Sequence, residues 1–232
     1  MERRVERVGG RPRQIGVSDV LRAGREIGLH KLSLSAVAAQ LGITTTALYR
    51  HVDGRWGLER LVGESIIAEL EITDDPAHGP VAHLLSSALQ LRTYLLTHPG
   101  LAAYVQTLFP RGAGGRKVLA EAAEALGKRG YSPETAVVMY AAVASLVIGF
   151  AAAEEAQRPR NDGLEAQRSD AHDALHADPR LGAAQRDLPV IDNDEYVRMW
   201  LGAAIRGFVT AAPPGSTLTE MRAALHAAGE DH

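Results

Sequence analysis

The chain has 232 residues, of which 46% are hydrophobic and 23% are charged. This composition is typical of a soluble globular protein, with enough chain for one large domain or two smaller ones. No apolar run approaches the ~20 residues that a membrane-spanning helix needs, and the basic first ten residues lack the apolar segment of a secretory signal. The absence of cysteine excludes disulfides, thiolate chemistry and Cys-based zinc sites, and it fits a cytoplasmic protein.

Charge is distributed unevenly along the chain. Residues 1–60 contain eleven Lys and Arg against six Asp and Glu, a net charge of +5, whereas residues 61–232 contain 14 against 22, a net charge of −8. A basic N-terminal segment on an acidic body suggests contact with a polyanion. An ordinary solvated surface with some clustering of charge is the alternative.

The N-terminal residues predict a basic arm followed by a first helix. Glycine and proline interrupt the arginine-rich segment 9–13, so we expect residues 1–15 to form a flexible arm. A helix is expected at about 18–27, because Ser18 can cap it and Gly28 can end it. The residues that repeat at helical spacing in this segment are Val17, Val20, Leu21, Gly24 and Ile27.

Two short helices separated by a glycine turn follow. Ser33 or Ser35 can cap the second helix, Gly42 ends it, and Thr44 caps a third helix in which Leu48 points to the core. Two short helices around a tight turn are the layout of a helix-turn-helix. An αα-hairpin that binds nothing has the same pattern.

The rest of the chain predicts further helices and no strand, because alanine is abundant and aromatic residues make up only 5%. The uncharged stretch 141–153 is expected to be buried nearly all round. The glycine-rich segment 112–115 and most of 158–193 are expected to be loops. The expected helices lie at about 55–72, 81–97, 101–108, 116–129, 133–157, 164–177, 194–212 and 219–228. The apolar side of the last long one is expected to contain Tyr196, Trp200, Ala203, Ala204, Gly207 and Phe208.

Catalytic motifs are not found. The chain has no GxSxG, no phosphate-binding glycine loop and no HExxH. His172 and His176 have the spacing of metal ligands on a helix, but the surrounding segment is polar and rich in alanine, which favours a solvated face. The acidic pairs at 154–155 and 192/194 are expected to be helix-terminal charges. We therefore expect no enzyme, no metal site and no cofactor.

The third helix carries the residues that suit DNA. Thr44, Thr45 and Thr46 lie at its N-terminus, where backbone N–H groups and the helix dipole favour a phosphate. Tyr49 and Arg50 follow one turn later; the alternatives are a half-buried core tyrosine and a solvated charge. The predicted DNA-binding residues are Ser33, Ser35, Thr44, Thr45, Thr46, Tyr49, Arg50, His51, Arg55, Arg11 and Arg13.

This region resembles a known family. The matching pattern is Gly28-x-x-x-Leu32-Ser33-Leu34-x-x-Val37-Ala38-x-x-Leu41-Gly42-Ile43-Thr44-x-x-Ala47-Leu48-Tyr49-Arg50-His51-Val52. It resembles the DNA-binding domain of TetR family transcriptional repressors, and the run 48–52 is particularly similar to the tetracycline repressor branch. The body resembles that branch more loosely, at residues 98–101, 132–134 and 149–151.

The resemblance implies an all-α homodimer of nine or ten helices per chain. Residues 16–54 would form the helix-turn-helix DNA-binding domain, 55–72 a connecting helix, and 73–232 a ligand-binding and dimerisation domain. Thr45, Thr46 and Tyr49 take DNA-facing positions and Thr44 the capping position. Arg55 replaces a phosphate-gripping lysine, a role that arginine can fill bidentately.

The same resemblance implies dimerisation through helices at about 132–157 and 194–212. Burial of these helices within one monomer is the alternative. It also implies a repressor that binds a pseudo-palindromic operator and is released when a small molecule binds the body. Gly54 departs from the polar cap usual before the phosphate-gripping residue, and the magnesium site of the tetracycline repressor does not carry over, because its histidines have no counterpart here.

Because the chain has few aromatic residues, a pocket is expected to be lined mainly by aliphatic side chains. The effector is therefore expected to be apolar or amphipathic. A helical small-molecule-binding or scaffold protein with only non-specific DNA binding is the competing function. The candidate ligand-binding residues are Gln90, Arg92, Tyr94, Tyr104, Phe109, Tyr140 and Trp200.

Overall fold

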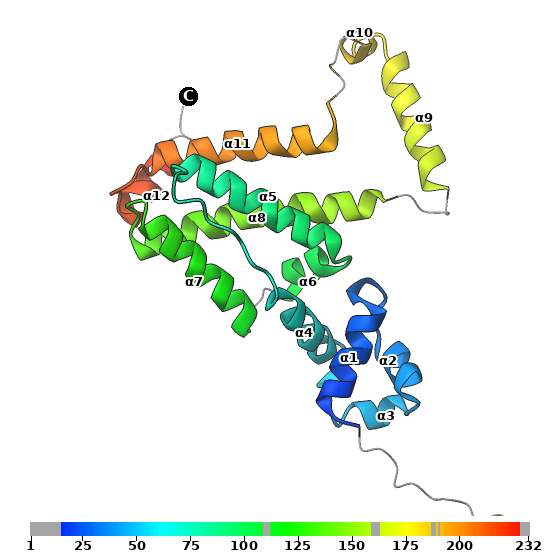
Figure 1. Cartoon of the computed structure of the whole chain (residues 1–232). Coiled ribbons are helices and arrows are strands. Elements are labelled where there is room, and N and C mark those ends of the chain that lie inside the picture. The colour runs from blue at the N-terminus through cyan, green and yellow to red at the C-terminus, as the bar shows by residue number, and fades with distance from the viewer. Residues whose placement is uncertain (1–14, 109–111, 159–162, 187–188, 190, 228–232) are drawn as a thin grey trace, which may run out of the picture. The chain divides into compact units, whose positions relative to one another are not determined.

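Every regular element in the described part of the chain is a helix, as the sequence predicts (Figure 1). The structure, a computed structural model, describes residues 15–108, 112–158, 163–186, 189 and 191–227. These residues form twelve α-helices and one 3-10 helix, η1 at Leu29–Lys31, so the expected count of nine or ten was too low. The excess lies toward the C-terminus, where α10 (Gly182–Arg186) occupies part of the expected loop.

The chain divides into two compact units, Met1–Val62 and Gly63–His232, which we call the head and the body. The boundary falls inside α4 (Gly54–Ile67), the helix that was expected to connect the two. The finer division of the chain into an arm, a DNA-binding domain, a connecting helix and a ligand-binding domain stays a prediction.

The head is built from α1 (Val17–Ile27), α2 (Leu34–Leu41), α3 (Thr45–Leu48) and the first part of α4. At Gly24, an added Cβ would lie 2.5 Å from Val62 Cγ2, so only glycine lets α1 come this close to α4. The buried apolar side chains of the head are Val20, Ala23, Leu32, Val37, Ala38, Leu48, Val52, Leu58 and Val62.

Two helix boundaries in the head region differ from expectation. Helix α1 begins at Val17, and its N-cap residue is Gly16 instead of the expected Ser18. The Gly16 N–H donates to Asp19 Oδ2 at 3.1 Å. Val17 is 47% exposed and does not belong to the inner face. Helix α4 ends at Ile67 instead of residue 72, because the N–H groups of Glu69 and Leu70 donate to carbonyls three residues back and form a turn.

The body is organised around α8 (Pro133–Gln157), which packs against five other helices. Ser132 caps it by accepting from the Thr135 N–H at 3.3 Å, and Pro133 occupies its first position, as the sequence predicts. Figure 1 shows α5 and α11 running alongside it. The helices in contact with α8 are α5 (Pro80–Thr97), α6 (Leu101–Leu108), α7 (Ala113–Gly127), α11 (Asn193–Ala211) and α12 (Leu218–Ala227).

Two long helices, α8 and α11, are apolar on more than one side. The stretch 141–153 is not buried all round, since Leu146 is exposed while Val143 and Val147 are buried. On α11 the side that packs in the core carries Val197, Leu201 and Ile205. The apolar side expected from the sequence includes Tyr196, which is 45% exposed, and Trp200, which is 54% exposed.

Helix α8 corrects a further expectation. By length and composition alone it could cross a membrane, although no apolar run was expected to be long enough. Contact with five helices gives its apolar residues a different explanation, because a helix at the centre of a bundle is surrounded by other side chains.

Helix α9 (Leu164–Ala177) forms where the sequence predicts it, and none of its residues is buried. It packs against the short helix α10. The expected loop at 112–115 is partly helical, because α7 begins at Ala113.

Gly114 brings the start of α7 against the backbone that follows α4. A Cβ on Gly114 would lie 2.7 Å from the Ala68 backbone nitrogen and 2.9 Å from Ala68 Cα. We therefore expect Gly114→Ala to lower the free energy of unfolding by about 1–3 kcal/mol, because the two backbones must separate. Urea denaturation followed by circular dichroism measures the change.

Gly127→Ala is the matched control on the same helix. An added Cβ there meets no described atom within 4 Å, and alanine has the higher helix propensity. Equal losses of stability in the two variants would contradict the close approach at Gly114.

Candidate nucleic-acid interface and ligand cavity

The helix-turn-helix of the head is defined by two capped helices and one left-handed turn. Ser33 accepts from the Ala36 N–H at 3.1 Å at the start of α2, and Thr44 accepts from the Ala47 N–H at 3.1 Å at the start of α3. Between them Gly42 has φ +67°, the left-handed conformation that favours glycine. The N-terminus of α3 is thereby fixed with its hydroxyl-bearing residues outward.

The residues predicted to face DNA are exposed in this motif. Thr44, Thr45, Thr46 and Arg50 are exposed, and Tyr49 is 58% exposed. Tyr49 is therefore not a half-buried core tyrosine, which was the alternative. Leu48, between these residues in the sequence, is fully buried and anchors the helix. Helix α3 and the two residues after it thus present exposed hydroxyl groups, a phenol and a guanidinium.

The other predicted contacts differ in how accessible they are. Ser35 is exposed and its Oγ lies 3.1 Å from Ser33 Oγ, while Ser33 and His51 are partly buried. A capping hydroxyl uses its oxygen as an acceptor, so the hydroxyl protons of Ser33 and Thr44 can still be donated. Arg11 and Arg13 lie outside the described residues.

The start of α4 carries the predicted Arg55 and adds an aromatic ring, Trp56, that was not among the predicted residues. Arg55 is exposed, its Nε donates to Glu59 Oε1 at 2.7 Å, and its guanidinium carbon lies 5.3 Å from the Trp56 ring centroid. Trp56 itself is 49% exposed. Its position directly after Arg55 is the feature of the sequence that could have pointed to it. Gly54 has φ +65°, which explains why a glycine replaces the polar cap.

The body contains an apolar cavity of about 120 Å³ between α5, α6, α7, α8 and the end of α4. Its walls are mostly aliphatic, as expected from the low aromatic content. Its lining residues are Ile67, Leu70, Leu91, Tyr94, Leu95, Leu101, Val105, Gly115, Val118, Leu119, Tyr140, Ala141, Ala144, Ser145 and Ile148.

A more polar groove of about 330 Å³ adjoins this cavity, because Val118 and Tyr140 line both. Its inner end contains His83, whose Nδ1 lies 2.8 Å from Asp74 Oδ1. Arg129 donates to both carboxylate oxygens of Asp74, at 2.7 Å to Oδ1, which His83 also contacts, and at 3.2 Å to Oδ2. These hydrogen bonds lower the pKa of Asp74, and burial lowers the pKa of His83.

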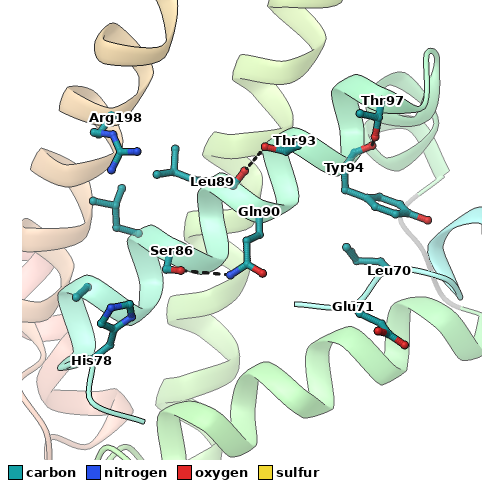
Figure 2. A pocket seen from close by; sticks show the side chains of 12 residues that line it. Leu70, Glu71, His78, Ser86, Leu89, Gln90, Thr93, Tyr94, Thr97 and Arg198 are labelled. Carbon is teal, nitrogen blue, oxygen red and sulfur yellow. Dashed lines mark hydrogen bonds between the residues drawn. The ribbon is translucent and has the colours of Figure 1, made fainter. Parts of the chain in front are cut away.

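The candidate ligand-binding residues are dispersed over the body. Tyr94 and Tyr140 line the apolar cavity. Gln90 lines a separate surface groove of about 730 Å³ along α5, together with Tyr94 (Figure 2). There the Gln90 side chain fixes the preceding loop, since it donates to the Thr73 carbonyl at 3.0 Å and accepts from the Thr73 N–H at 2.8 Å.

Three further candidates lie elsewhere. Arg92 forms a buried bidentate pair with Glu154 at 2.6 and 2.7 Å and a third contact with Asp194 at 2.7 Å, so these acids are more than helix-terminal charges. Tyr104 packs on Gly63. Trp200 lines a shallow hollow on the exposed side of α11 and does not reach the apolar cavity. Phe109 lies outside the described residues.

The two histidines of α9 lie close together on an exposed helix. His172 Nε2 and His176 Nε2 are 2.9 Å apart. Within the described ranges, no group of three or more His, Cys, Asp or Glu side chains could hold a metal ion.

Stability should fall in mild acid because His83 is buried in its neutral form. In the unfolded chain this histidine takes up a proton near pH 6.5, whereas in the folded chain its pKa is lower. The unfolded state then binds more protons, so the free energy of unfolding falls as the pH drops below about 6.5. Asp74 adds a further loss at more acidic pH, below about 3.9, because its pKa is depressed in the fold.

Urea midpoints at pH 7.5 and 5.5 test this for the wild type and for His83→Asn. Asparagine can keep the bond to Asp74 but does not titrate. We expect a smaller decrease in the variant, and an equal decrease in both proteins would contradict the role of His83.

Comparison with known proteins identifies the fold. No protein-family model matches the sequence, and no curated protein matches it. The TetR family protein ActR of Streptomyces coelicolor, in complex with actinorhodin, superposes with a TM-score of 0.72 at 20% identity, covering 88% of this chain and 100% of ActR. The chain has the TetR family fold.

Two further structures with the TetR-like fold show a similar degree of likeness. A single-residue variant of TetR from Acinetobacter baumannii AYE, in complex with minocycline, gives a TM-score of 0.60 at 22% identity, covering 87% of this chain and 94% of that one. Mycobacterium smegmatis BioQ gives 0.57 at 21% identity, covering 84% and 97%. Helices α2 and α3 lie within residues 28–52, where the sequence predicts the helix-turn-helix.

Proposed function

We propose that this protein is a ligand-responsive transcriptional regulator of the TetR family. It binds a pseudo-palindromic operator as a homodimer in the cytoplasm, represses transcription, and leaves the DNA when a small molecule occupies the body. The observation that carries the proposal is a helix-turn-helix whose α3 exposes Thr45, Thr46, Tyr49 and Arg50 on a head of net charge +5.

DNA recognition by α3 follows from the chemistry of its exposed side chains. Threonine hydroxyls and arginine donate to phosphate oxygens, and a threonine methyl can contact a thymine methyl in the major groove. Arg55, two-thirds exposed, can reach a phosphate if it exchanges its contact with Glu59 for one with DNA. Such an exchange costs little, because exposed ion pairs contribute about 1 kcal/mol or less.

Dimerisation is supported by the exposed apolar sides of α8 and α11. These two helices pack against each other, and their outer side chains surround a hollow of about 340 Å³. A second copy would cover apolar area that a monomer leaves in water. The exposed large apolar residues of the two helices are Val137, Val138, Leu146, Tyr196, Met199 and Trp200.

Regulation by a small molecule is supported by the apolar cavity next to α4. The cavity is small compared with the ~300–1,000 Å³ of typical ligand sites, so a ligand must widen it. A ligand that prefers the widened body shifts the equilibrium toward that state, and α4, which belongs to both units, can carry the shift to the head. The structures of ActR and of the Acinetobacter baumannii TetR variant were determined with actinorhodin and minocycline bound, respectively.

In-vitro selection of bound DNA from a random duplex pool, at two salt concentrations, tests the proposal. An enriched inverted repeat is the expected result, because a symmetric dimer reads two half-sites about 34–36 Å apart. Sedimentation of the free protein at twice the 24.8 kDa chain mass is expected alongside it. Binding without enrichment, with a steep loss at higher salt, would favour the competing helical ligand-binding or scaffold protein.

A further inference from the structure

Two buried polar groups of the body face the same groove and lack partners. His83 on α5 is 3% exposed and Tyr140 on α8 is 6% exposed. Both line the polar groove, and neither His83 Nε2 nor the Tyr140 hydroxyl has a hydrogen-bond partner among the described residues. An unpaired buried polar group is destabilising, so two of them on residues that line one groove point to a ligand that pairs with both.

The hydrogen-bonding role of His83 is fixed by Asp74. A carboxylate only accepts hydrogen bonds, so the ring proton is on Nδ1, 2.8 Å from Asp74 Oδ1. Arg129 also donates to Asp74, from Nη2 to the same Oδ1 at 2.7 Å and from Nη1 to Oδ2 at 3.2 Å, and so holds the carboxylate in place. Burial keeps the ring neutral by lowering its pKa. His83 Nε2 is therefore a bare lone pair that accepts a hydrogen bond.

Tyr140 supplies a hydrogen to be donated. Burial, together with the negative charge of Glu121, raises the pKa of Tyr140 to about 12, so the phenol keeps its proton at neutral pH. The pair thus offers one acceptor and one donor. A hydroxyl group complements both, because it can donate to His83 and accept from Tyr140 at once.

The apolar cavity adjoins this pair. Tyr140 and Val118 line both the polar groove and the apolar cavity, so Tyr140 lies where the two hollows adjoin. A molecule that fills the cavity would bring one end to Tyr140 and His83.

We propose that the effector is a neutral, mainly apolar molecule that carries a hydroxyl group, a phenol or an alcohol, bound between His83 Nε2 and the Tyr140 hydroxyl with its apolar part in the cavity. This inference rests on the proposed function and names the ligand class of that regulator.

The charges around the groove exclude a carboxylate as the polar end. Glu71, Asp74, Glu121 and Glu124 line the groove, against two lysines. Lys128 Nζ lies 2.9 Å from Glu124 Oε1 and Lys117 Nζ 3.9 Å from Glu121 Oε1, so each lysine is already neutralised by an acid. A carboxylate would also lie against the lone pair of His83 Nε2, to which it has no hydrogen to donate.

Calorimetric titration of the full-length protein with 2-naphthol, naphthalene and 2-naphthoate tests the proposal. These probes share one ring system and differ in the polar end. We expect 2-naphthol to bind roughly tenfold more tightly than naphthalene, and 2-naphthoate to bind more weakly than 2-naphthol.

Three variants test whether the preference for 2-naphthol over naphthalene depends on the Tyr140 hydroxyl and on His83 Nε2. Tyr140→Phe removes the donor, and His83→Asn removes the acceptor while keeping a donor toward Asp74. Both should reduce the preference for 2-naphthol over naphthalene to about threefold or less. Tyr131→Phe is the matched control, because the Tyr131 hydroxyl is also buried and unpaired within the described chain but lines none of these pockets. It should keep the full preference.

Equal affinities for 2-naphthol and naphthalene, binding of neither, or a preference that survives in both site variants would overturn the inference. So would 2-naphthoate binding as tightly as 2-naphthol. The proposed function fails separately: a chain that enriches an inverted repeat but shows no hydroxyl preference loses only this inference. A chain with the hydroxyl preference and no sequence-selective DNA binding is a ligand-binding protein of another function.

Discussion

The double variant Thr45→Ala, Tyr49→Ala is expected to bind the selected inverted repeat roughly 100-fold more weakly than the wild type. Both side chains are exposed on α3, and loss of each contact with a base or phosphate is expected to cost at least about 1.4 kcal/mol, a factor of ten. The effect should be larger on the selected site than on random duplex. Fluorescence anisotropy with labelled duplexes at fixed salt measures both affinities.

The fold should tolerate this change. Neither side chain belongs to the buried core of the head, and surface substitutions usually change stability by less than about 0.5 kcal/mol. Thr219→Ala on α12, also at an exposed threonine, is the control and should bind DNA as the wild type does. Unchanged affinity in a folded double variant would show that α3 is not the recognition helix.

Arg129→Met is expected to lower the free energy of unfolding by about 3–5 kcal/mol, the usual cost of removing one partner from a buried ion pair. The Arg129 side chain is 8% exposed and donates to both carboxylate oxygens of Asp74. It also donates to the backbone carbonyls of His78, Asp75 and Ala125 at 2.9, 2.8 and 2.7 Å. Methionine leaves all of these acceptors without their donor.

Lys128→Met supplies the comparison at the neighbouring position. Lys128 is exposed and forms one ion pair, with Glu124, on the same helix end. Such pairs contribute about 0.3–0.5 kcal/mol. Chemical denaturation of the two variants should separate them by several kcal/mol, and equal losses would mean that Arg129 does not hold the loop before α5.

The starts of α2, α3 and α8 were predicted correctly, because they depend on neighbouring residues. Ser33 and Thr44 cap the helices that their side chains predict, Gly42 takes the left-handed turn, and Ser132 followed by Pro133 starts α8. Each of these signals is a hydrogen bond or a backbone preference within about four residues, so the sequence contains it in full. The all-α class and the helix-turn-helix followed from them.

The faces of the long helices were predicted less well. On α11 the apolar residues chosen from the sequence include Tyr196 and Trp200, which are exposed, whereas Val197, Leu201 and Ile205 fill the core. A helix that is apolar on two sides gives no periodic signal for which side is inward. Only the packing of its neighbours decides.

The polar site of the body was predicted only at Tyr140. His83, Asp74 and Arg129 come from α5, from the loop before it and from the chain after α7, and Tyr140 comes from α8. In the sequence they are isolated polar residues without a motif. Their protonation states also depend on burial and on one another.

The sequence by itself thus determined most of the helices, the caps of α2, α3 and α8, and the exposed hydroxyl groups at the start of α3, because these depend on local hydrogen bonds and on one short motif. The tertiary structure alone decided which sides of α8 and α11 remain exposed, how the apolar cavity is lined, and which buried polar atoms meet beside Tyr140. Contacts between residues far apart in the chain exist only once the helices pack, and helix packing depends on the shape of the whole body.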